Sequence, residues 1–557
     1  MPRMTGGRFL AETLSGYGVT HAFFVPAIVR RALVEMEKVG IQRIVTHGEK
    51  AAAYMADGYA RAAGRPGVCM AQTVGAANLA AGLQDAYLGL SPVIAITGHR
   101  PLMHQYRNSY QEIAHFSAFE PVTKYNVVVD SVEQLPHLLR QAFRESTSGA
   151  PGPVHLDFQG AQGEVIAEGE ANLEVIIEEK FSRVPAIRPE PEAEMVREAA
   201  KVLSEARRPI IVAGGGVATS QAKGEVVELA EMLSIPVATS LNAKGTIPDD
   251  HPLSVGVVGS YSRWCANRAV AEADLVLFIG SHTGSQVTLD WQIPPMDTPV
   301  IQIDIDPSQL GRSYPARVAL QGDAKVTTRR LIEALEPIGA RTEWVNRVQQ
   351  LVGDWRTESE PMLNSDAVPI RPERICKEVT DFLPSDALVV SDTGHSGIWT
   401  GTMMDLKSPD QSYIRCAGSL GWGLSAALGA KCAVPERPVM CFSGDGGFWY
   451  HIAELETAVR YGINAVVVVN NNRSLNQEKR GTEGTYAGEP GDSDAIWHFT
   501  DVNFARVAQD IGCFGIRVEK PGDLGSALEQ ALASGRPAVV DVASDMEGIA
   551  APPWSGR

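Results

Sequence analysis

Pro438-Val-Met-Cys-Phe-Ser-Gly-Asp-Gly-Gly447 and Ala465-Val-Val-Val-Val-Asn-Asn-Asn472 are two apolar runs of strand length, one ending in glycines and the other in asparagines. Between them, apolar residues recur at helical spacing from Phe448 to Arg460, and Gly462 is a typical helix stop. A strand–helix–strand unit usually places its two strands side by side and parallel. The stretch therefore predicts an α/β fold built on a parallel sheet.

Asp445 and Asn472 should lie at the same edge of that sheet, because each follows the carboxyl end of its strand. A carboxylate and an amide oxygen side by side suit a hard cation such as Mg²⁺. Gly444, Gly446 and Gly447 leave the backbone open to a diphosphate at a helix N-terminus. A dinucleotide site would need a third spaced glycine and an acid about 20 residues further on. Neither is present, and asparagines end the second strand instead.

Length and composition exclude several classes of protein. The chain has 557 residues and a net charge of −17, which argues against a nucleic acid or an anionic membrane as partner. No run approaches the ~18 apolar residues that a membrane span needs, and the N-terminus lacks the apolar region of a signal peptide. The seven cysteines form no CxxC pair, which predicts buried free thiols and a cytoplasmic location.

Three units follow one another along the chain. Helices and strands alternate over residues 1–185, 190–350 and 365–557, and proline-rich segments predict linkers near 184–192 and 353–372. The outer units share a pattern of a small-residue helix, an Arg-Pro pair, a strand and a glycine turn. This repetition predicts two similar α/β domains that flank a third.

These features resemble the thiamine diphosphate (ThDP) enzymes, whose hallmark is Gly-Asp-Gly followed, one helix later, by Asn-Asn. The decarboxylase and acetolactate synthase group also has two similar domains around a central one, and the resemblance covers essentially the whole chain. It implies three doubly wound parallel-sheet domains, named pyrimidine-binding, central and diphosphate-binding. It also implies ThDP and Mg²⁺ as cofactors, and a homodimer or homotetramer with its sites at subunit interfaces.

The resemblance assigns roles to individual residues. Glu49, at the start of an Ala-rich helix, would activate the aminopyrimidine of the cofactor, and Leu420 would be the apolar wedge between its rings. Backbone groups of Gly418 and Leu420 would hold the pyrimidine. The first diphosphate loop would contain Gly394, His395 and Ser396, and the Mg²⁺ ligands would be Asp445, Asn472 and the backbone carbonyl of Ser474.

Each of three assignments has a simpler alternative that depends on no cofactor. Glu49 could be an exposed acid favoured by the helix dipole. Leu420 could be a core leucine between glycines. His395 could belong to a solvated loop.

Substrate-side residues are also implied by resemblance. Gln111, in Tyr110-Gln-Glu112, matches a Phe-Gln-Glu of acetolactate synthases. Glu478 is the candidate acid or base, with a solvated acid at a helix start as the alternative. Ile28 and Val29 stand where some relatives carry an acid or a histidine, which predicts an apolar pocket floor.

The central unit resembles a nucleotide-binding domain through Gly214-Gly-Gly216 and Asp304-Ile-Asp306. His282 replaces an arginine that contacts FAD in relatives. FAD, an ADP or CoA moiety, and an empty domain therefore all stay open for this unit.

The expected activity is a ThDP-dependent cleavage or formation of a C–C bond next to a carbonyl. In an acetolactate synthase-like reaction, a 2-oxo acid would be decarboxylated and joined to an acceptor. A 2-hydroxyacyl-CoA lyase, a sulfoacetaldehyde acetyltransferase and a simple 2-oxo acid decarboxylase are the alternatives within the family. A non-catalytic protein that binds a nucleotide or FAD is the alternative of another class, and Glu49 argues against it.

Overall fold

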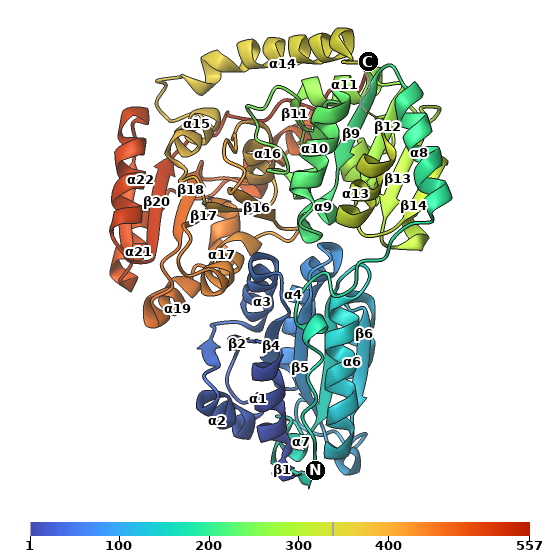
Figure 1. The fold of residues 1–557 in the computed structure, drawn as a ribbon. Coiled ribbons are helices and arrows are strands. Elements are labelled where there is room, and N and C mark those ends of the chain that lie inside the picture. Colours follow the sequence, from blue (N-terminus) through green and yellow to red (C-terminus); the bar gives the residue numbers. More distant parts are fainter. Residues whose placement is uncertain (1, 337–338, 557) are drawn as a thin grey trace.

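The computed structural model describes residues 2–336 and 339–556, so residues 1 and 557, the outer limits of the predicted units, lie outside the described residues. Figure 1 shows three lobes, each a parallel sheet with helices on its faces. The predicted fold class, three α/β domains with parallel sheets, is confirmed.

The N-terminal lobe contains a six-stranded parallel sheet in the order β3-β2-β4-β5-β7-β6. Its strands are β2 (His21–Phe24), β3 (Gln42–Val45), β4 (Gly67–Ala71), β5 (Val93–His99), β6 (Tyr125–Val129) and β7 (Val154–Gln159). Its helices are α1 (Gly6–Gly16), α2 (Arg30–Lys38), α3 (Glu49–Ala63), α4 (Gly75–Leu88), α5 (His115–Phe119), α6 (Leu135–Thr147) and α7 (Glu164–Glu168). A short antiparallel pair, β1 (Arg3–Thr5) with β8 (Glu170–Asn172), joins the two ends of the lobe.

The C-terminal lobe repeats this topology with the order β16-β15-β17-β18-β20-β19. Its strands are β15 (Leu388–Ser391), β16 (Ser412–Arg415), β17 (Val439–Gly444), β18 (Val466–Asn471), β19 (Phe514–Val518) and β20 (Ala538–Ala543). Its helices are α15 (Pro372–Phe382), α16 (His395–Thr402), α17 (Trp422–Ala433), α18 (Asp445–Trp449), α19 (Glu454–Tyr461), α20 (Lys479–Tyr486), α21 (Phe504–Ile511) and α22 (Leu524–Ala533). The two outer lobes therefore match strand for strand, as the repeated sequence pattern predicts.

The central lobe has a different order, β11-β10-β9-β12-β13-β14, which is doubly wound about β9. Its strands are β9 (Pro209–Ala213), β10 (Val237–Thr239), β11 (Ser254–Val257), β12 (Leu275–Ile279), β13 (Val300–Asp304) and β14 (Ala316–Gln321). Its helices are α8 (Ala193–Glu205), α9 (Gly215–Thr219), α10 (Lys223–Leu233), α11 (Trp264–Glu272), α12 (Ser285–Thr288) and α13 (Ala324–Ala334).

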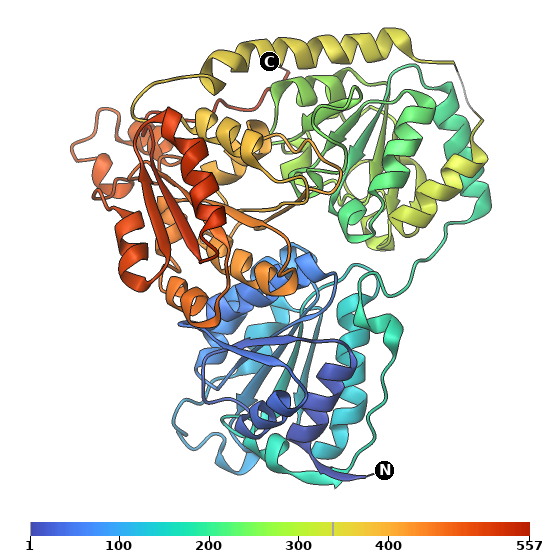
Figure 2. The same ribbon diagram turned by 60° about the vertical axis from the view of Figure 1, so that its left-hand side comes forward.

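Two local predictions are wrong. The segment expected to be a linker from residue 353 is helical up to Leu363, because α14 (Thr342–Leu363) buries Trp344, Leu351 and Trp355, and Pro361 lies within its last turn. In Figures 1 and 2, α14 runs across the top of the central and C-terminal lobes. The single helix expected from Phe448 to Arg460 is instead two helices, α18 and α19, separated by a turn. Gly462 does end α19, with φ at 64°.

The N- and C-terminal lobes meet through α3 and α17. The two helices approach at backbone distance, since a Cβ at Gly58 would lie 2.0 Å from the Ala426 carbonyl oxygen. Their interface belongs to one apolar core that both lobes share. The relative position of the two lobes is therefore fixed by close packing of small residues.

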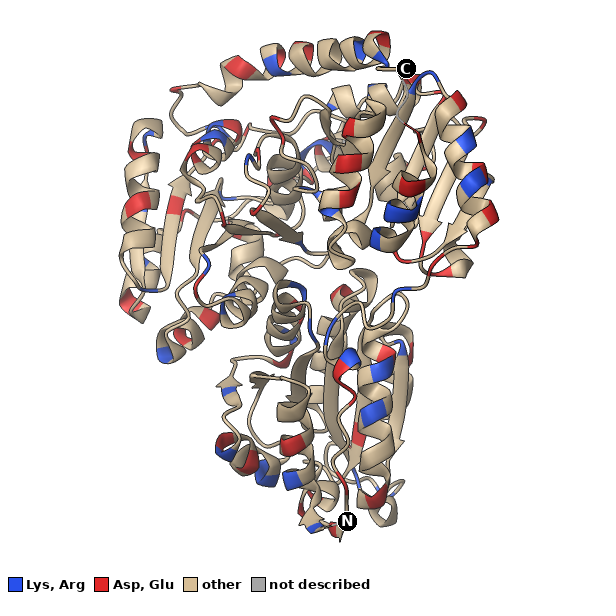
Figure 3. Ribbon diagram, in the orientation of Figure 1, with Lys and Arg blue, Asp and Glu red and all other residues tan. Residues whose placement is uncertain are grey.

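Charged residues lie mainly on the outer helices, with few on the sheets (Figure 3). Among the described residues, no helix combines the length and apolar character needed to cross a bilayer. Six of the seven cysteines are buried and Cys432 is half-buried, and all are free thiols, as predicted.

Candidate functional site

The predicted sheet edge forms between β17 and β18. The two strands pair in parallel, with Gly444 opposite Asn470, so that Asp445 and Asn472 emerge at the same end. Both side chains are buried. Arg473 has a φ of 59°, and this left-handed residue turns the chain back so that Ser474 reaches the same place.

Asp445, Asn472 and Ser474 are in direct contact. The Ser474 backbone N–H donates to Asp445 Oδ2 at 2.9 Å and to Asn472 Oδ1 at 3.1 Å, and the Ser474 hydroxyl donates to Asn472 Oδ1 at 2.9 Å. Burial raises the pKa of Asp445 from 3.8 to about 7. At about 1.4 kcal/mol per pKa unit, ionising this carboxyl costs about 4 kcal/mol more than in water, a penalty that a bound cation would offset.

The oxygen set fits a magnesium ion in its chemistry. The predicted set would contain one carboxylate, one amide oxygen and the backbone carbonyl of Ser474, and Mg²⁺ takes few protein ligands of this kind and keeps several waters. No group of three or more His, Cys, Asp and Glu side chains suited to a metal occurs in the described part of the chain. A transition-metal centre built from three such side chains is therefore not an alternative to the magnesium site among the described residues.

The predicted diphosphate loop lies beside this edge, at the start of α16. Gly394 precedes the helix with a φ of 65°, and the Ser396 side chain is buried. His395 is half-buried, and its Nδ1 lies 2.5 Å from Asn476 Oδ1, so the solvated-loop alternative is wrong. Burial also lowers the pKa of His395, which favours the neutral ring. The N-terminal amides of α16 are suited to an anion.

Glycines in the same region pack too closely against their neighbours to be replaced by a residue with a side chain. A Cβ at Gly446 would lie 2.5 Å from Leu475 Cδ2, and a Cβ at Gly447 would lie 3.0 Å from Asp392 Oδ2. These residues line a cavity of about 330 Å³ that also contains Asp445 and Asn472. Asn470 also lines this cavity, and its buried Oδ1 has no hydrogen-bond partner in the described structure. A glycine turn, a helix N-terminus and the oxygens of Asp445 and Asn472 fit a diphosphate with its cation.

Leu420 stands on the rim of this cavity, and its alternative role as a core leucine is wrong. The residue is 37% exposed although it lies between glycines in a tight loop, and it lines the cavity together with Gly418. Gly418 has a φ of 157° and no heavy atom within 4 Å of an added Cβ. A leucine left exposed at a cavity is costly unless a ligand covers it.

Glu49 and Gln111 lie on the N-terminal lobe. Glu49 begins α3, is half-buried, and accepts a hydrogen bond from Asn78 Nδ2 at 3.2 Å. Gln111 has a φ of 62° and its Oε1 accepts from the Thr73 hydroxyl at 3.0 Å. The turn at residues 73–75 contacts both, since a Cβ at Gly75 would lie 2.3 Å from Glu49 Oε1. Neither Glu49 nor Gln111 lines the cavity of Asp445 in the described chain.

The two remaining substrate-side predictions have different outcomes. Glu478 lines the cavity, but it is exposed at the N-terminus of α20, so its role stays a prediction. Ile28 and Val29 are fully buried in the core of the N-terminal lobe and show no surface to a pocket. The predicted apolar pocket floor at these two residues is therefore wrong within one chain.

Sequence reasoning passed over Asp392, which is central to the site. Its buried carboxylate accepts from the backbone N–H groups of Thr393, Gly421 and Gly423 at 2.7, 3.2 and 3.1 Å. Burial raises its pKa to about 6. Asp392 directly follows β15 at the carboxyl edge of the sheet, the same signal that singled out Asp445.

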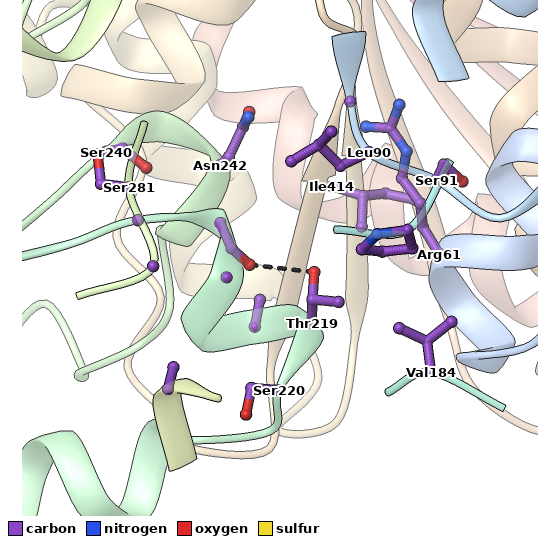
Figure 4. Close-up of a pocket in the computed structure, with 18 of the residues that line it drawn as sticks. Arg61, Leu90, Ser91, Val184, Thr219, Ser220, Ser240, Asn242, Ser281 and Ile414 are labelled. Atoms are coloured by element: carbon purple, nitrogen blue, oxygen red, sulfur yellow. Dashed lines mark hydrogen bonds between the residues drawn. The ribbon is translucent and has the colours of Figure 1, made fainter. Parts of the chain in front are cut away.

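A larger cavity of about 660 Å³ lies between the three lobes (Figure 4). The central lobe contributes the turn of Gly214 to Gly216, Ser240, Asn242 and Ser281, while Arg61 and Leu90 enter from the N-terminal lobe and Ile414 from the C-terminal lobe. Asp304 and His282 are also in its wall, with their side chains 3.9 Å apart. This cavity is the place that the nucleotide-like pattern of the central unit predicts.

Comparison with known proteins matches each lobe to a family. Residues 4–119 match the thiamine pyrophosphate enzyme N-terminal TPP binding domain, residues 196–331 the central domain, and residues 392–542 the C-terminal TPP binding domain. Thiamine pyrophosphate is another name for ThDP. Together these matches reach into all three lobes, and strands β6, β7 and β15 lie outside the matched ranges.

Full-length relatives agree with this assignment. The chain is 33% identical to a Methanocaldococcus jannaschii protein named "Probable acetolactate synthase large subunit", over 100% of this chain and 94% of the relative. It is 30% identical to the acetolactate synthase isozyme 1 large subunit of Escherichia coli, over 98% and 95%. It is 31% identical to an acetolactate synthase of Mycobacterium bovis, over 97% and 88%. The chain therefore belongs to the thiamine pyrophosphate enzyme family, as a ThDP-dependent enzyme of its acetolactate synthase-like group.

Proposed function

We propose that this enzyme decarboxylates pyruvate and joins the remaining two-carbon unit to a second 2-oxo acid, with 2-acetolactate and CO₂ as products from two pyruvates. The observation that carries the proposal is the convergence of Asp445, Asn472 and Ser474 at one sheet edge, together with full-length similarity to acetolactate synthases. When bound, ThDP supplies an electron-accepting ring that lets a C–C bond beside a carbonyl break or form.

Each part of the chain has a role in this proposal. Asp445, Asn472 and the Ser474 carbonyl hold Mg²⁺, and the N-terminus of α16 binds the diphosphate. Leu420 keeps the two rings of the cofactor apart. Glu49 exchanges a proton with the aminopyrimidine, and Asn78 orients its carboxylate. Thr73 orients Gln111 toward the substrate. Glu478 borders the same cavity, within reach of a proton on the product side.

A product assay tests the reaction. Purified enzyme with ThDP, Mg²⁺ and pyruvate is expected to form 2-acetolactate and CO₂ in equal amounts, measured by mass spectrometry and gas release. Removal of Mg²⁺ with a chelator should stop both. Acetaldehyde without acetolactate would instead mark a simple decarboxylase. Acetyl phosphate from sulfoacetaldehyde would mark an acetyltransferase, and cleavage of a 2-hydroxyacyl-CoA would mark a lyase. Any of these three results would overturn the proposal.

A complete site on this proposal needs two chains. Within one chain, the N-terminal end of α3 lies against α19, since the His47 backbone N–H donates to Glu454 Oε1 at 3.0 Å. Further along the same helix, Asp57 accepts from Trp422 Nε1 at 2.8 Å, and Asp57 lies about 12 Å along the helix from Glu49. Exposed apolar side chains surround the Gln111 segment, with Met103 73% and Tyr106 95% exposed. Such a patch is typical of a subunit interface, and a homodimer or homotetramer would cover it.

Hetero-dimers with two different tags test whether the site is shared. A dimer of one Glu49→Gln chain and one Asp445→Ala chain should regain about half of the wild-type activity, because one of its two sites is intact. The matched control pairs a wild-type chain with a chain that carries both substitutions. It should be inactive when sites are shared between chains. Activity in the control and none in the first dimer would place each site within one chain.

We also propose a nucleotide in the 660 Å³ cavity between the three lobes. The glycine turn at 214–216 is chemically suited to a phosphate, and the buried carboxyl of Asp304 is suited to a ribose. FAD, ADP and CoA are the candidates, and burial raises the pKa of Asp304. Calorimetric titration of the enzyme with FAD, ADP and CoA distinguishes the three candidates. A flavin absorbance band in the purified enzyme would also identify FAD. If none of the three binds, the central domain is empty.

A further inference from the structure

The loop at residues 417–423, which follows β16 and includes the first two residues of α17, is held by two buried carboxylates. Asp85, from α4 of the N-terminal lobe, accepts from the backbone N–H groups of Ala417, Gly418 and Ser419 at 2.8, 3.2 and 3.1 Å. Asp392, from the C-terminal lobe, accepts from Gly421 and Gly423 at 3.2 and 3.1 Å. Consecutive N–H groups on one carboxylate fix a backbone more tightly than neutral hydrogen bonds do.

Leu420 is the one residue between the two held segments. Its neighbours on both sides donate to a carboxylate, and its own side chain stands out on the cavity rim, 37% exposed. Tethering on both sides leaves the loop little freedom to rotate this side chain into the core. The geometry therefore explains how Leu420 is kept at the cavity and out of the core.

Asp85 is itself held by the end of α3. Arg61 Nη2 lies 3.4 Å from Asp85 Oδ1, and the same guanidinium binds both oxygens of Asp57 at 2.7 and 2.8 Å. Arg61 Nη1 also donates to the Arg415 carbonyl oxygen at 2.7 Å, just before the loop. Asp57 in turn accepts from Trp422 Nε1 at 2.8 Å, just after Gly421. A buried carboxylate is stable only with such compensation.

We propose that Asp85 is a positioning residue for the cofactor: it fixes the 417–423 loop so that Leu420 and the backbone of Gly418 face the bound pyrimidine. The proposal rests on the ThDP function above and adds a role for the N-terminal lobe of the same chain. That lobe supports the cavity of its own chain through Asp85, while its Glu49 serves the site of another chain.

The test is the substitution Asp85→Asn, which keeps the shape of the side chain. An amide has one acceptor oxygen, and its NH₂ group would face the N–H donors of the loop, so at least one of the three bonds is lost. Hydrogen–deuterium exchange of the peptide containing residues 415–423, measured by mass spectrometry without cofactor, should become faster. The ThDP affinity by calorimetry should fall roughly 10- to 100-fold, with a smaller change in kcat at saturating ThDP.

Asp249→Asn is the matched control. Asp249 is also a buried carboxylate between lobes, paired with Lys244 at 3.0 Å, and it accepts from the Leu406 backbone N–H at 2.9 Å. Its loss should lower the melting temperature without changing ThDP affinity or exchange in the 415–423 peptide. Equal effects of both variants on ThDP affinity would reduce Asp85 to a general structural role and overturn the proposal.

A double-mutant cycle with Leu420→Ala tests whether Asp85 affects ThDP binding by positioning the loop of Leu420 or by stabilising the fold in general. If Asp85 acts through the loop that carries Leu420, the loss of ThDP affinity in the double variant should be smaller than the two single losses combined, because the effects of coupled residues do not add. Additive effects would contradict the proposal, as would wild-type exchange in Asp85→Asn. Absence of ThDP binding in the wild type would instead refute the proposed function, and the exchange measurement would still decide whether Asp85 holds the loop.

Discussion

Replacing Glu49 by glutamine is expected to slow exchange of the C2 proton of bound ThDP by about 100- to 10,000-fold, the usual contribution of a positioned acid–base group. Glutamine keeps the size of the side chain and can still accept from Asn78 Nδ2. It cannot exchange a proton with the aminopyrimidine. The rate is measured by quenching the enzyme–cofactor complex in D₂O at timed intervals and reading deuterium by NMR.

Two controls keep this result specific to proton transfer. ThDP affinity of Glu49→Gln, measured by calorimetry, should stay within about tenfold of the wild type, because the diphosphate is bound by the other lobe. Asn78→Ala, which removes only the orienting hydrogen bond, should slow exchange far less. An unchanged exchange rate in Glu49→Gln would show that the catalytic assignment of Glu49 is wrong.

Replacing Asp445 by alanine is expected to abolish Mg²⁺-dependent ThDP binding. Asp445 is the only carboxylate in the predicted ligand set, and its loss leaves the amide oxygen of Asn472 and one backbone carbonyl for a divalent cation. Burial raises the pKa of the Asp445 carboxyl to about 7. Because burial disfavours the charged form of this group, its removal should not weaken the fold of the cofactor-free protein through loss of an ion pair. Calorimetric titration with ThDP in the presence of Mg²⁺ measures the effect.

Ser474→Ala is the matched control for Asp445→Ala. The predicted ligand from Ser474 is its backbone carbonyl, and its backbone N–H still donates to Asp445. Only the hydroxyl bond to Asn472 is lost. We expect ThDP affinity to fall no more than about tenfold, the size of one hydrogen bond. Wild-type affinity in Asp445→Ala would refute the magnesium assignment.

The sequence was sufficient to predict the fold class and half of the site. Hydrophobic periodicity around Gly444 and Asn472 requires adjacent parallel strands, and adjacency places Asp445 and Asn472 at one edge. These signals are local, because they depend only on the spacing of apolar residues along each strand and helix. The same reasoning was wrong for α14 and for the break between α18 and α19, because burial of Trp344 and Trp355 and a turn at 450–453 depend on distant partners.

The sequence by itself determined the chemistry of the short motifs, because that chemistry depends only on residue types at fixed spacing. Only the tertiary structure decided which of those residues share a cavity. Glu49 and Asp445 lie on different lobes, α3 packs closely on α17, and Glu49 is not among the residues that line the cavity of its own chain. Asp85 has no motif to mark it, because the N–H groups that it accepts are more than 300 residues away in the chain. Contacts of that separation arise from the packing of whole domains, which residue spacing does not encode.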